Sequence, residues 1–377
     1  MTSKRISALI MLLLIFSTML MVGVKSYFSG SEFPKYNRFF FMAEYMEDIE
    51  TFVKENFPGG EQLENSAVYL QRFLGKNEFD GIFLGEDMLI EDIGQPDEKL
   101  MQNNLYEVRK FVEMASSTPM SVLYLPTKYA IKQQELPDFA ENFAFNQKSF
   151  IEKNYASLSG KATTVDAYSP LLSNSDKYLY YRSAPDLTGL GAYYVYSALV
   201  QRMGQSPLPQ SDFTLQHFAH DFYGETYENS PFKDISPDIV TLYHPTNQST
   251  VSVTHFSDYK YTYNTLYPAH KTGLDVILGG NTGDITISSG LKRQRSLLVL
   301  GDSSIMPVLP LLSAHYYNIR FIDFENWNDK ALTELDVEEY DQVLIAYSVD
   351  SMIHESYPAQ LRQLRLQQES RMENTEE

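Results

Sequence analysis

The pattern of apolar and polar positions predicts strand–helix–strand units on both sides of a β-rich middle segment. Continuous apolar runs, typical of strands buried on both faces of a parallel sheet, occupy residues 121–125, 296–300, 319–324 and 342–348. Apolar residues at helical spacing predict helices over 96–114, 147–157, 188–203 and 304–315. These units predict an α/β fold with helices flanking a parallel sheet, and such sheets bind ligands at the carboxyl ends of their strands.

Weaker patterns complete the prediction for the globular part. Two short apolar runs around Gly85-Glu86-Asp87 predict a hairpin, and residues 162–165 predict a short strand. Residues 204–294 are rich in Thr, Ser, Tyr, Asn and Gly and alternate with a period of two, which predicts a β-rich insertion without a helix. Residues 358–377 form a polar tail with weak helical periodicity, which we expect to fray.

The N-terminal pattern differs from the rest of the chain. Residues 6–24 contain no charge, and 19 helical residues are long enough to cross a bilayer. Lys4 and Arg5 precede this run and Lys25 follows it, with no good signal-peptidase site. We therefore expect an uncleaved signal anchor in the lipid bilayer, a cytoplasmic N-terminus and an extracytoplasmic remainder.

Four parts follow from these patterns. Residues 1–25 form the cytoplasmic tip and anchor, and residues 26–59 form a linker and a juxtamembrane helix predicted over 36–57. Residues 60–357 form the main domain, which includes the insertion at 204–294. Residues 358–377 form the tail.

Composition narrows the function classes. The 377 residues carry 30 Lys+Arg against 49 Asp+Glu, and the three basic residues of 1–25 leave the remainder with a net charge of −22. Because a phosphate backbone would repel such a surface, a nonspecific nucleic-acid binder is excluded. The chain has no cysteine, which excludes disulfides, thiolate metal sites, a thiol nucleophile and a lipoprotein anchor.

One motif carries candidate chemistry. Gly301-Asp302-Ser303 follows a predicted strand and opens a predicted helix. A serine at such a turn is exposed and lies near free backbone N–H groups that stabilise an oxyanion. Asp and Ser are also ordinary helix caps, so the tripeptide alone leaves a structural role open.

Four sequence blocks place this motif in a wider context. They are VLYLPTKYAI at 122–131, YYRSAPDLTGLGAYYVYSAL at 180–199, LLVLGDSSIMPVLPLLSAHYYNIRFIDF at 297–324 and VLIAYSVDSM at 343–352. In this order they resemble the DHHW family of SGNH hydrolase-like proteins, relatives of the alginate O-acetyltransferases. The resemblance covers most of residues 60–352. It implies an SGNH-like fold, a bacterial membrane anchor and action outside the cell.

The resemblance also implies partners. Proteins of this kind act on polymers of the cell surface. For this chain we expect a cell-surface polysaccharide or a teichoic-acid-like polymer. They commonly work beside a membrane-bound O-acyltransferase. No cofactor is expected. His217 and His220 form an H-x-x-H pair, but a third ligand is not obvious, so we predict no metal site.

The residues that give the family its name are changed in this chain. Aligned on Arg182 and on the segment from Thr188 to Tyr194, the Asp-His-His-Trp positions hold Ala184, Pro185, Asp186 and Leu187. In the family, the Asp and the second His complete a triad with the Ser of Gly-Asp-Ser. Ala184 therefore replaces the orienting Asp, and Asp186 replaces the general base of Ser303. A serine hydroxyl without an adjacent base is a poor nucleophile.

Further residues are candidates for the same site. Tyr347 ends a predicted strand, and the resemblance suggests that it lines the site, although a packed aromatic side chain is an equal alternative. Lys128 follows another strand and is expected to line the same cleft, and Arg182 is a candidate binding residue. His354 follows the last strand and is the most plausible replacement base, whereas His315 is expected to cap a helix.

Two functions remain open. The first is a non-catalytic binding or accessory subunit of cell-envelope polysaccharide modification, in which exposed aromatic rings pack against sugars. The second is an active O-acyltransferase or esterase that uses Ser303, with Asp186 as a doubtful base. A histidine nitrogen within hydrogen-bonding reach of the Ser303 hydroxyl would favour the second.

Overall fold

The computed structural model describes residues 16–17, 19–31, 49, 52, 77–114, 118–137, 140, 144–248, 250–257, 259–292, 294–327 and 335–376. The chain forms two compact units, Met1–Lys76 and Asn77–Glu377. Within the first unit, residues 19–29 are helical. Among the described residues, no helix is both long enough and apolar enough to cross a membrane. Much of the predicted anchor at 6–24, and nearly all of the predicted helix at 36–57, lie outside the described residues.

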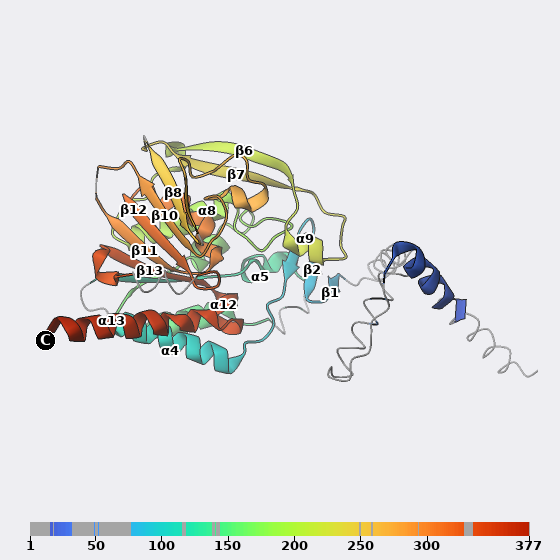
Figure 1. Cartoon of the computed structure of the whole chain (residues 1–377), viewed down its shortest axis with the longest axis horizontal. Coiled ribbons are helices and arrows are strands. Elements are labelled where there is room, and N and C mark those ends of the chain that lie inside the picture. Colours follow the sequence, from blue (N-terminus) through green and yellow to red (C-terminus); the bar gives the residue numbers. More distant parts are fainter. Residues whose placement is uncertain are drawn as a thin grey trace, which may run out of the picture. The chain divides into compact units, whose positions relative to one another are not determined.

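The second unit contains an eight-stranded sheet with the order β5-β4-β13-β11-β12-β10-β8-β9 (Figure 1). Five neighbouring strands are parallel: β5 (Thr163–Val165), β4 (Met120–Leu125), β13 (Gln342–Ser348), β11 (Ser296–Gly301) and β12 (Asn318–Asp323). The other three continue the sheet antiparallel to their neighbours: β10 (Asp284–Ser289), β8 (Val251–Phe256) and β9 (Lys260–Tyr263). The predicted parallel sheet is therefore confirmed as a mixed, mostly parallel sheet.

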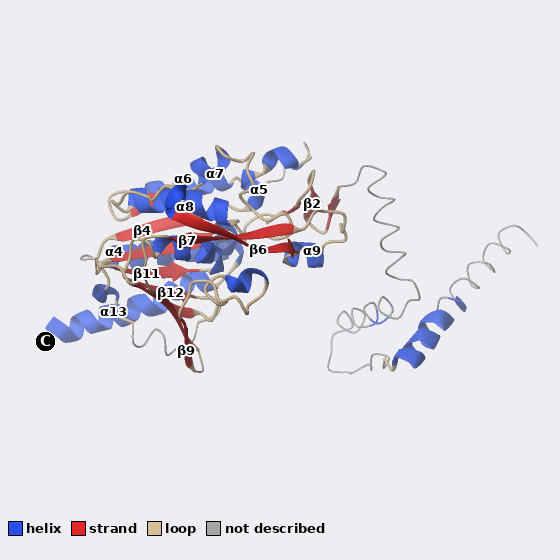
Figure 2. Ribbon diagram, turned by 90° about the horizontal axis from the view of Figure 1, so that it is seen from above, coloured by secondary structure: helices blue, strands red, loops and turns tan. Residues whose placement is uncertain are grey.

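Helices cover both faces of this sheet (Figure 2). One layer consists of α6 (Gln147–Ser157), α7 (Tyr168–Leu172) and α8 (Gly189–Arg202), with the short α5 (Lys128–Ile131) at its edge. The opposite layer consists of α4 (Glu98–Met114), α12 (Val349–His354) and α13 (Leu361–Glu376), which lie together below the sheet in Figure 1. Two strand pairs lie outside the sheet: β6 (Phe213–Phe222) with β7 (Asp238–Pro245), and the hairpin of β2 (Ile82–Leu84) and β3 (Leu89–Glu91), which β1 (Glu78–Phe79) extends. The predicted hairpin at Gly85-Glu86-Asp87 is thus confirmed.

Three expectations need correction. Residues 204–294 are rich in β-strands, as predicted, but they are not an insertion apart from the main fold, because β8, β9 and β10 belong to the main sheet. This segment also contains the short helix α9 (Glu225–Asn229). The helix predicted over 304–315 is a 3₁₀ turn, Ser303–Val308, followed by the short α10 (Leu309–Leu312). Pro307 and Pro310 lack the N–H groups that a continuous α-helix needs. The tail is helical as α13 and is held in place, since Leu361 and Leu364 are fully buried.

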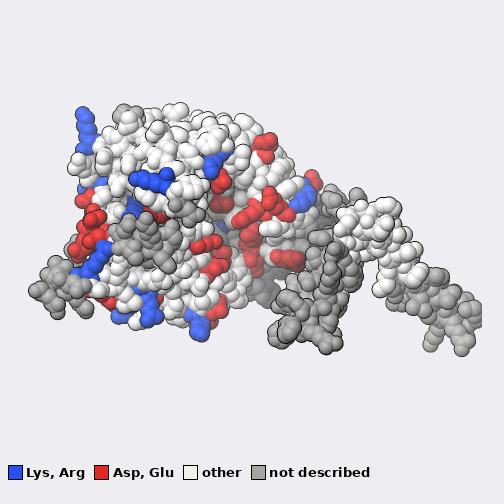
Figure 3. Space-filling view, viewed as in Figure 1, with Lys and Arg blue, Asp and Glu red and all other residues white. Residues whose placement is uncertain are grey.

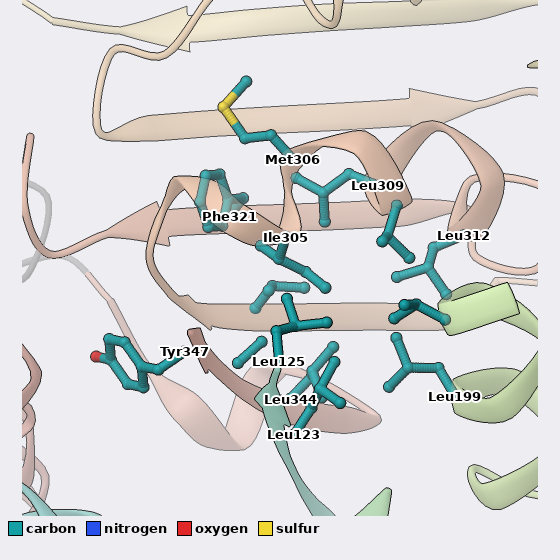
Figure 4. Packing of buried hydrophobic residues seen from close by; sticks show 14 of the residues in the cluster. Leu123, Leu125, Leu199, Ile305, Met306, Leu309, Leu312, Phe321, Leu344 and Tyr347 are labelled. Atoms are coloured by element: carbon teal, nitrogen blue, oxygen red, sulfur yellow. The ribbon is translucent and has the colours of Figure 1, made fainter. Parts of the chain in front are cut away.

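The core lies between the sheet and these helices. Figure 4 shows side chains of β4 and β13 packed against those of the 3₁₀ turn, α10 and α8; they include Leu123, Leu344, Ile305 and Leu199, all fully buried. Apolar burial on both faces explains why the central strands read as continuous apolar runs. This packing fixes the carboxyl ends of β4, β11 and β13 side by side, and the candidate site lies at those ends.

Candidate functional site

A cavity of about 210 Å³ lies at the carboxyl ends of three parallel strands. It is lined by residues 125–127 after β4, 302–304 after β11, and 348, 350 and 351 after β13. The segment around Asp186 and the first residue of α9, Glu225, complete the wall. The structure thus brings Ser303 and Asp186, two of the residues predicted from the sequence, into one cavity.

The turn that carries Ser303 is held by Asp302 and Gly301. The Ser304 N–H donates to Asp302 Oδ1 at 3.0 Å, and the Ser348 N–H donates to Asp302 Oδ2 at 2.8 Å. Asp302 is buried, so it acts as a brace between the ends of β11 and β13. A Cβ on Gly301 would lie 1.8 Å from the carbonyl oxygen of Ala346, so a side chain there would push the two strands apart. Both residues therefore position the serine.

Ser303 itself is exposed, and its hydroxyl makes no hydrogen bond to any residue that the structure describes. Among the described residues that line the cavity, none is a histidine, lysine or arginine. The Ser304 N–H, one of the predicted oxyanion donors, is already bound by the Asp302 carboxylate. The turn presents a serine, but the described residues supply no conventional base for it.

The two histidines that the sequence placed after the strands of the sheet, His354 and His315, are hydrogen-bonded to other residues. His354 Nδ1 lies 2.8 Å from the Asp350 carboxylate, and His354 Nε2 lies 2.9 Å from the carbonyl oxygen of Gln95. His354 therefore does not line the cavity, although its partner Asp350 does. His315 does not cap a helix; its Nε2 lies 2.6 Å from the Tyr196 hydroxyl.

The electrostatics of the cavity are acidic. Burial raises the pKa of Asp186 to about 6; the negative charge of Glu225 also raises it, and the ammonium of Lys128 opposes both effects. Burial likewise raises the pKa of Glu225. Acidic side chains gather over α9, which carries Glu225 and Glu228, on the face shown in Figure 3. The cavity consequently favours uncharged or cationic ligand groups over anionic ones.

Lys128 was expected to line the cavity, but the structure places it behind the cavity wall. Its side chain is buried, and its Nζ donates to the carbonyl oxygens of Leu89, Tyr181 and Ala184 at 2.5, 2.8 and 2.7 Å, with Arg182 at 3.3 Å. Burial lowers the pKa of Lys128 to about 7, against the opposing effects of nearby carboxylates. Lys128 therefore holds the segment that carries Asp186.

Arg182 likewise contacts other residues of the protein and does not line the cavity. Its Nε donates to Asp87 Oδ2 at 2.9 Å, and its guanidinium lies 4.7 Å from the centre of the Tyr178 ring. Its backbone N–H donates to Asp238 Oδ1 at 2.7 Å. These contacts fix the start of the 182–187 segment and place Arg182 outside the cavity lining.

Tyr347 is fully buried, and its hydroxyl has no hydrogen-bond partner among the described residues. Figure 4 shows its ring beside β13 at the edge of the core. Burial raises the pKa of this phenol well above its usual range, and the charges of Asp302 and Asp323 act in the same direction. Tyr347 is not part of the cavity wall, so the structure places it in the packed role that the sequence left open.

Three residues of the site region were not predicted from the sequence. Asp238 is fully buried and binds the backbone N–H groups of Arg182 and Ser183, and also the hydroxyls of Tyr178 and Ser183. Glu225 and Asp350 line the cavity. Asp350 follows a strand end, which is a usable signal, whereas Asp238 and Glu225 lie in a segment whose pairing the sequence did not reveal.

A mixed, mostly parallel α/β sheet with an exposed serine after one of its strands is the arrangement expected of an SGNH-like fold. Residues 97–322, more than half of the chain, match the family described as DHHW protein. The chain belongs to the DHHW family, as its sequence blocks predicted.

Several solved structures share the fold of this chain. A DHHW family protein from Eubacterium siraeum DSM 15702 aligns with a TM-score of 0.65 and 18% identity, over 76% of this chain and 96% of that chain. Bacillus cereus PatB1 aligns with a TM-score of 0.59 and 12% identity, over 73% of this chain and 98% of PatB1. The structure of PatB1 with a sulfonyl adduct aligns with a TM-score of 0.57 and 14% identity, over 73% of this chain and 96% of that chain. At these identities the likeness shows the fold alone. No curated protein matches the chain.

Proposed function

We propose that this protein is a non-catalytic, carbohydrate-binding member of its family that serves cell-envelope polysaccharide modification. One observation carries the proposal: among the described residues, the cavity around the Ser303 hydroxyl is lined by no histidine, and this hydroxyl has no hydrogen-bond partner. A general base typically contributes about 10²–10⁴-fold to such chemistry. Without it, the cavity is better suited to holding a ligand than to transferring an acyl group.

The ligand class follows from the lining. Ser303, Ser304, Ser348 and Ser351 offer hydroxyls, and the lining also holds four carboxylates, those of Asp186, Glu225, Asp302 and Asp350. Together these groups match the donors and acceptors of sugar hydroxyls. Carboxylates repel a phosphate-bearing backbone, so a neutral polysaccharide segment fits better than a teichoic-acid-like polymer. Loss of the base from a family associated with polysaccharide chemistry supports an accessory role beside a membrane-bound O-acyltransferase.

The anchor and the location belong to the same proposal. Five apolar side chains of the described N-terminal helical residues are between 49% and 69% exposed: Phe16, Met19, Leu20, Met21 and Val24. Exposed apolar side chains in an uncharged run suit a lipid environment. We infer a single-pass protein of the bacterial cell membrane whose main domain lies outside the cytoplasm.

A second candidate function rests on Asp186. Its carboxylate lines the same cavity as Ser303, and its pKa of about 6 makes it a better proton acceptor than an ordinary aspartate. In this alternative, Asp186 takes the Ser303 proton while Ser303 Oγ attacks an ester carbonyl. Activity would then rise with pH through about 6, as Asp186 ionises.

Ester turnover and covalent labelling separate the two functions. The purified full chain in mild detergent is compared with Ser303→Ala and Asp186→Asn, using a chromogenic acetyl ester and an aromatic sulfonyl fluoride. We expect background turnover and no Ser303 sulfonylation by intact mass in all three proteins. Turnover or labelling that disappears in Ser303→Ala establishes the enzyme and overturns the accessory role.

Binding is tested separately with isolated cell-wall polysaccharide. We expect Ser303→Ala to bind as the unmodified chain does, because the hydroxyl is one of several polar groups in the cavity. Ser303→Trp fills the cavity from an exposed position and should weaken binding at least tenfold. Equal binding by the Trp variant would remove the cavity from the proposal.

A further inference from the structure

Two carboxylates in the lining of the cavity described above have no ion-pair partner. Asp302 is occupied by backbone N–H groups, and Asp350 is paired with His354, whose Nδ1 lies 2.8 Å away. Asp186 and Glu225, by contrast, pair with no lysine, arginine or histidine that the structure describes. Because carboxylates taken out of water are generally paired, two unpaired ones in a single cavity point to a cation that the ligand supplies.

Glu225 is held in the cavity wall by the contacts of its neighbours. The Gly224 N–H donates to Ser183 Oγ at 2.8 Å, and the Tyr227 N–H donates to the Ser183 carbonyl oxygen at 3.0 Å. A Cβ on Gly224 would lie 2.5 Å from the Ala184 Cβ, so the start of α9 packs directly on the segment that carries the other carboxylate. Ala184 stands where the family's orienting aspartate is expected. Its small side chain lets α9 approach, and α9 brings a carboxylate to the same cavity.

The charges around these two carboxylates are mainly negative. Burial and the charge of Glu225 raise the pKa of Asp186 to about 6. Burial, followed by the charges of Glu91 and Glu228, raises the pKa of Glu225. Lys128 opposes the effect on Asp186 from behind the wall, but its Nζ donates to backbone carbonyl oxygens. A cation between the two carboxylates relieves their repulsion, so the ionised pair favours a positively charged ligand group.

The rest of the lining indicates an organic cation attached to a sugar. Among the described residues, no group of three or more His, Asp or Glu side chains is placed to hold a metal ion, which disfavours an inorganic cation. Part of the lining is apolar and includes Leu125, Pro126, Tyr180 and Leu187, and the serines add hydroxyls. Apolar side chains pack against the apolar face of a sugar ring, while the serine hydroxyls bind the ring hydroxyls. A protonated amino group on that ring supplies the donors that the carboxylates lack.

We propose that the cavity at Ser303 binds an amino sugar, a hexosamine unit of the polymer whose amino group is free and protonated, with the ammonium held between Asp186 and Glu225. The choice of a carbohydrate rests on the proposed function, whereas the preference for a positive charge rests on the two unpaired carboxylates. An N-acetylated unit has no charge to offer them. The protein would therefore hold those stretches of the polymer that carry free amino groups.

Two oligosaccharides that differ in charge test this preference. The full chain in mild detergent is titrated calorimetrically at about pH 6.5 with the hexamer of glucosamine and with the hexamer of N-acetylglucosamine, which share one backbone. Asp186→Asn combined with Glu225→Gln removes both charges and keeps the shapes of the side chains. The control, Asp221→Asn combined with Glu228→Gln, removes two charges at exposed positions outside the cavity lining. Melting temperatures verify folding, and Glu225→Gln alone, at an exposed position, replaces the double variant if that variant does not fold.

We expect the unmodified chain and the control to bind the glucosamine hexamer at least tenfold more tightly than the N-acetylated hexamer. In the variant without the two carboxylates, the two hexamers should bind within about twofold of each other. Ser303→Trp should lower the affinity for the glucosamine hexamer about tenfold. Equal binding of the two hexamers by the unmodified chain, no binding of the glucosamine hexamer, or the same loss in the control overturns the inference.

The proposed function fails on different results. Ester turnover that depends on Ser303 removes the accessory role and leaves the preference for the amino sugar standing. Equal binding of both hexamers that Ser303→Trp weakens keeps the carbohydrate-binding role and removes only the preference for the amino sugar.

Discussion

The Lys128 ammonium donates a hydrogen bond to the carbonyl oxygen of Ala184 at 2.7 Å. Ala184 occupies the position where the family's orienting aspartate is expected, and Asp186 lies two residues later. In this segment, which differs from the family's Asp-His-His-Trp motif, the buried ammonium of Lys128 on α5 binds the backbone carbonyl oxygens. A buried cation thus fixes the backbone of the segment in which this chain departs from the family's motif.

Replacing this ammonium should loosen the segment. Lys128→Met leaves buried carbonyl oxygens without a donor, at about 1–3 kcal/mol for each unsatisfied group. We expect the free energy of unfolding to fall by about 2–4 kcal/mol, and amide hydrogen exchange of residues 181–187 to accelerate. Urea unfolding and exchange mass spectrometry measure both effects. Lys148→Met, at an exposed position, should change neither, and normal protection of 181–187 in Lys128→Met would contradict the role given to Lys128.

Asp238 supports the same segment from the other side. Its carboxylate accepts the N–H groups of Arg182 and Ser183 at 2.7 and 2.9 Å and is fully buried. In Asp238→Asn one acceptor becomes a donor that faces other donors, so we expect the free energy of unfolding to fall by about 3–5 kcal/mol. Chemical denaturation tests this, with Asp275→Asn as the exposed control. A loss below about 1 kcal/mol would mean that water satisfies these N–H groups.

The sequence predicted the parallel strands and the long helices α4, α6 and α8 because each carries a regular apolar pattern over enough residues. It misplaced β8, β9 and β10, since strand pairing depends on partners distant along the chain, and alternation alone does not identify them. It also missed Asp238, because a buried aspartate looks like any surface aspartate until its four donors are known. Ser303 was found because a strand followed by Gly-Asp-Ser has a defined place at the sheet edge.

His315 predicts a measurable acid sensitivity. Burial lowers its pKa from 6.5 to about 4, and the Tyr196 hydroxyl, which accepts the Leu208 N–H, is free to donate to the neutral ring. Because the unfolded chain binds a proton near pH 6.5 and the folded protein resists it, stability falls as pH drops from about 6.5 to about 4. His315 contributes at most about 3 kcal/mol to that fall.

The measurement compares unfolding free energies at pH 7.5 and pH 4.5. His315→Gln lowers stability at pH 7.5 by the lost hydrogen bond, yet its pH dependence should be shallower than that of the unmodified chain. His220→Gln, at an exposed position, should keep the original slope. Parallel pH profiles for all three proteins would show that His315 does not titrate as a buried group.

A gain of function provides the most direct test of how much of the family's catalytic geometry this chain retains. Asp186→His restores the family's base at a position that lines the same cavity as Ser303. If the segment held by Lys128 and Asp238 still aims position 186 at the serine, the imidazole activates Ser303. Turnover of a chromogenic acetyl ester should then rise on the order of 10²-fold above that of the unmodified chain at pH 8, short of the full effect because Ala184 supplies no orienting carboxylate. Ser303→Ala in the same background should return turnover to background. Asp186→Asn is the matched control for loss of the negative charge, so equal rates for the His and Asn variants would show that position 186 no longer reaches the serine.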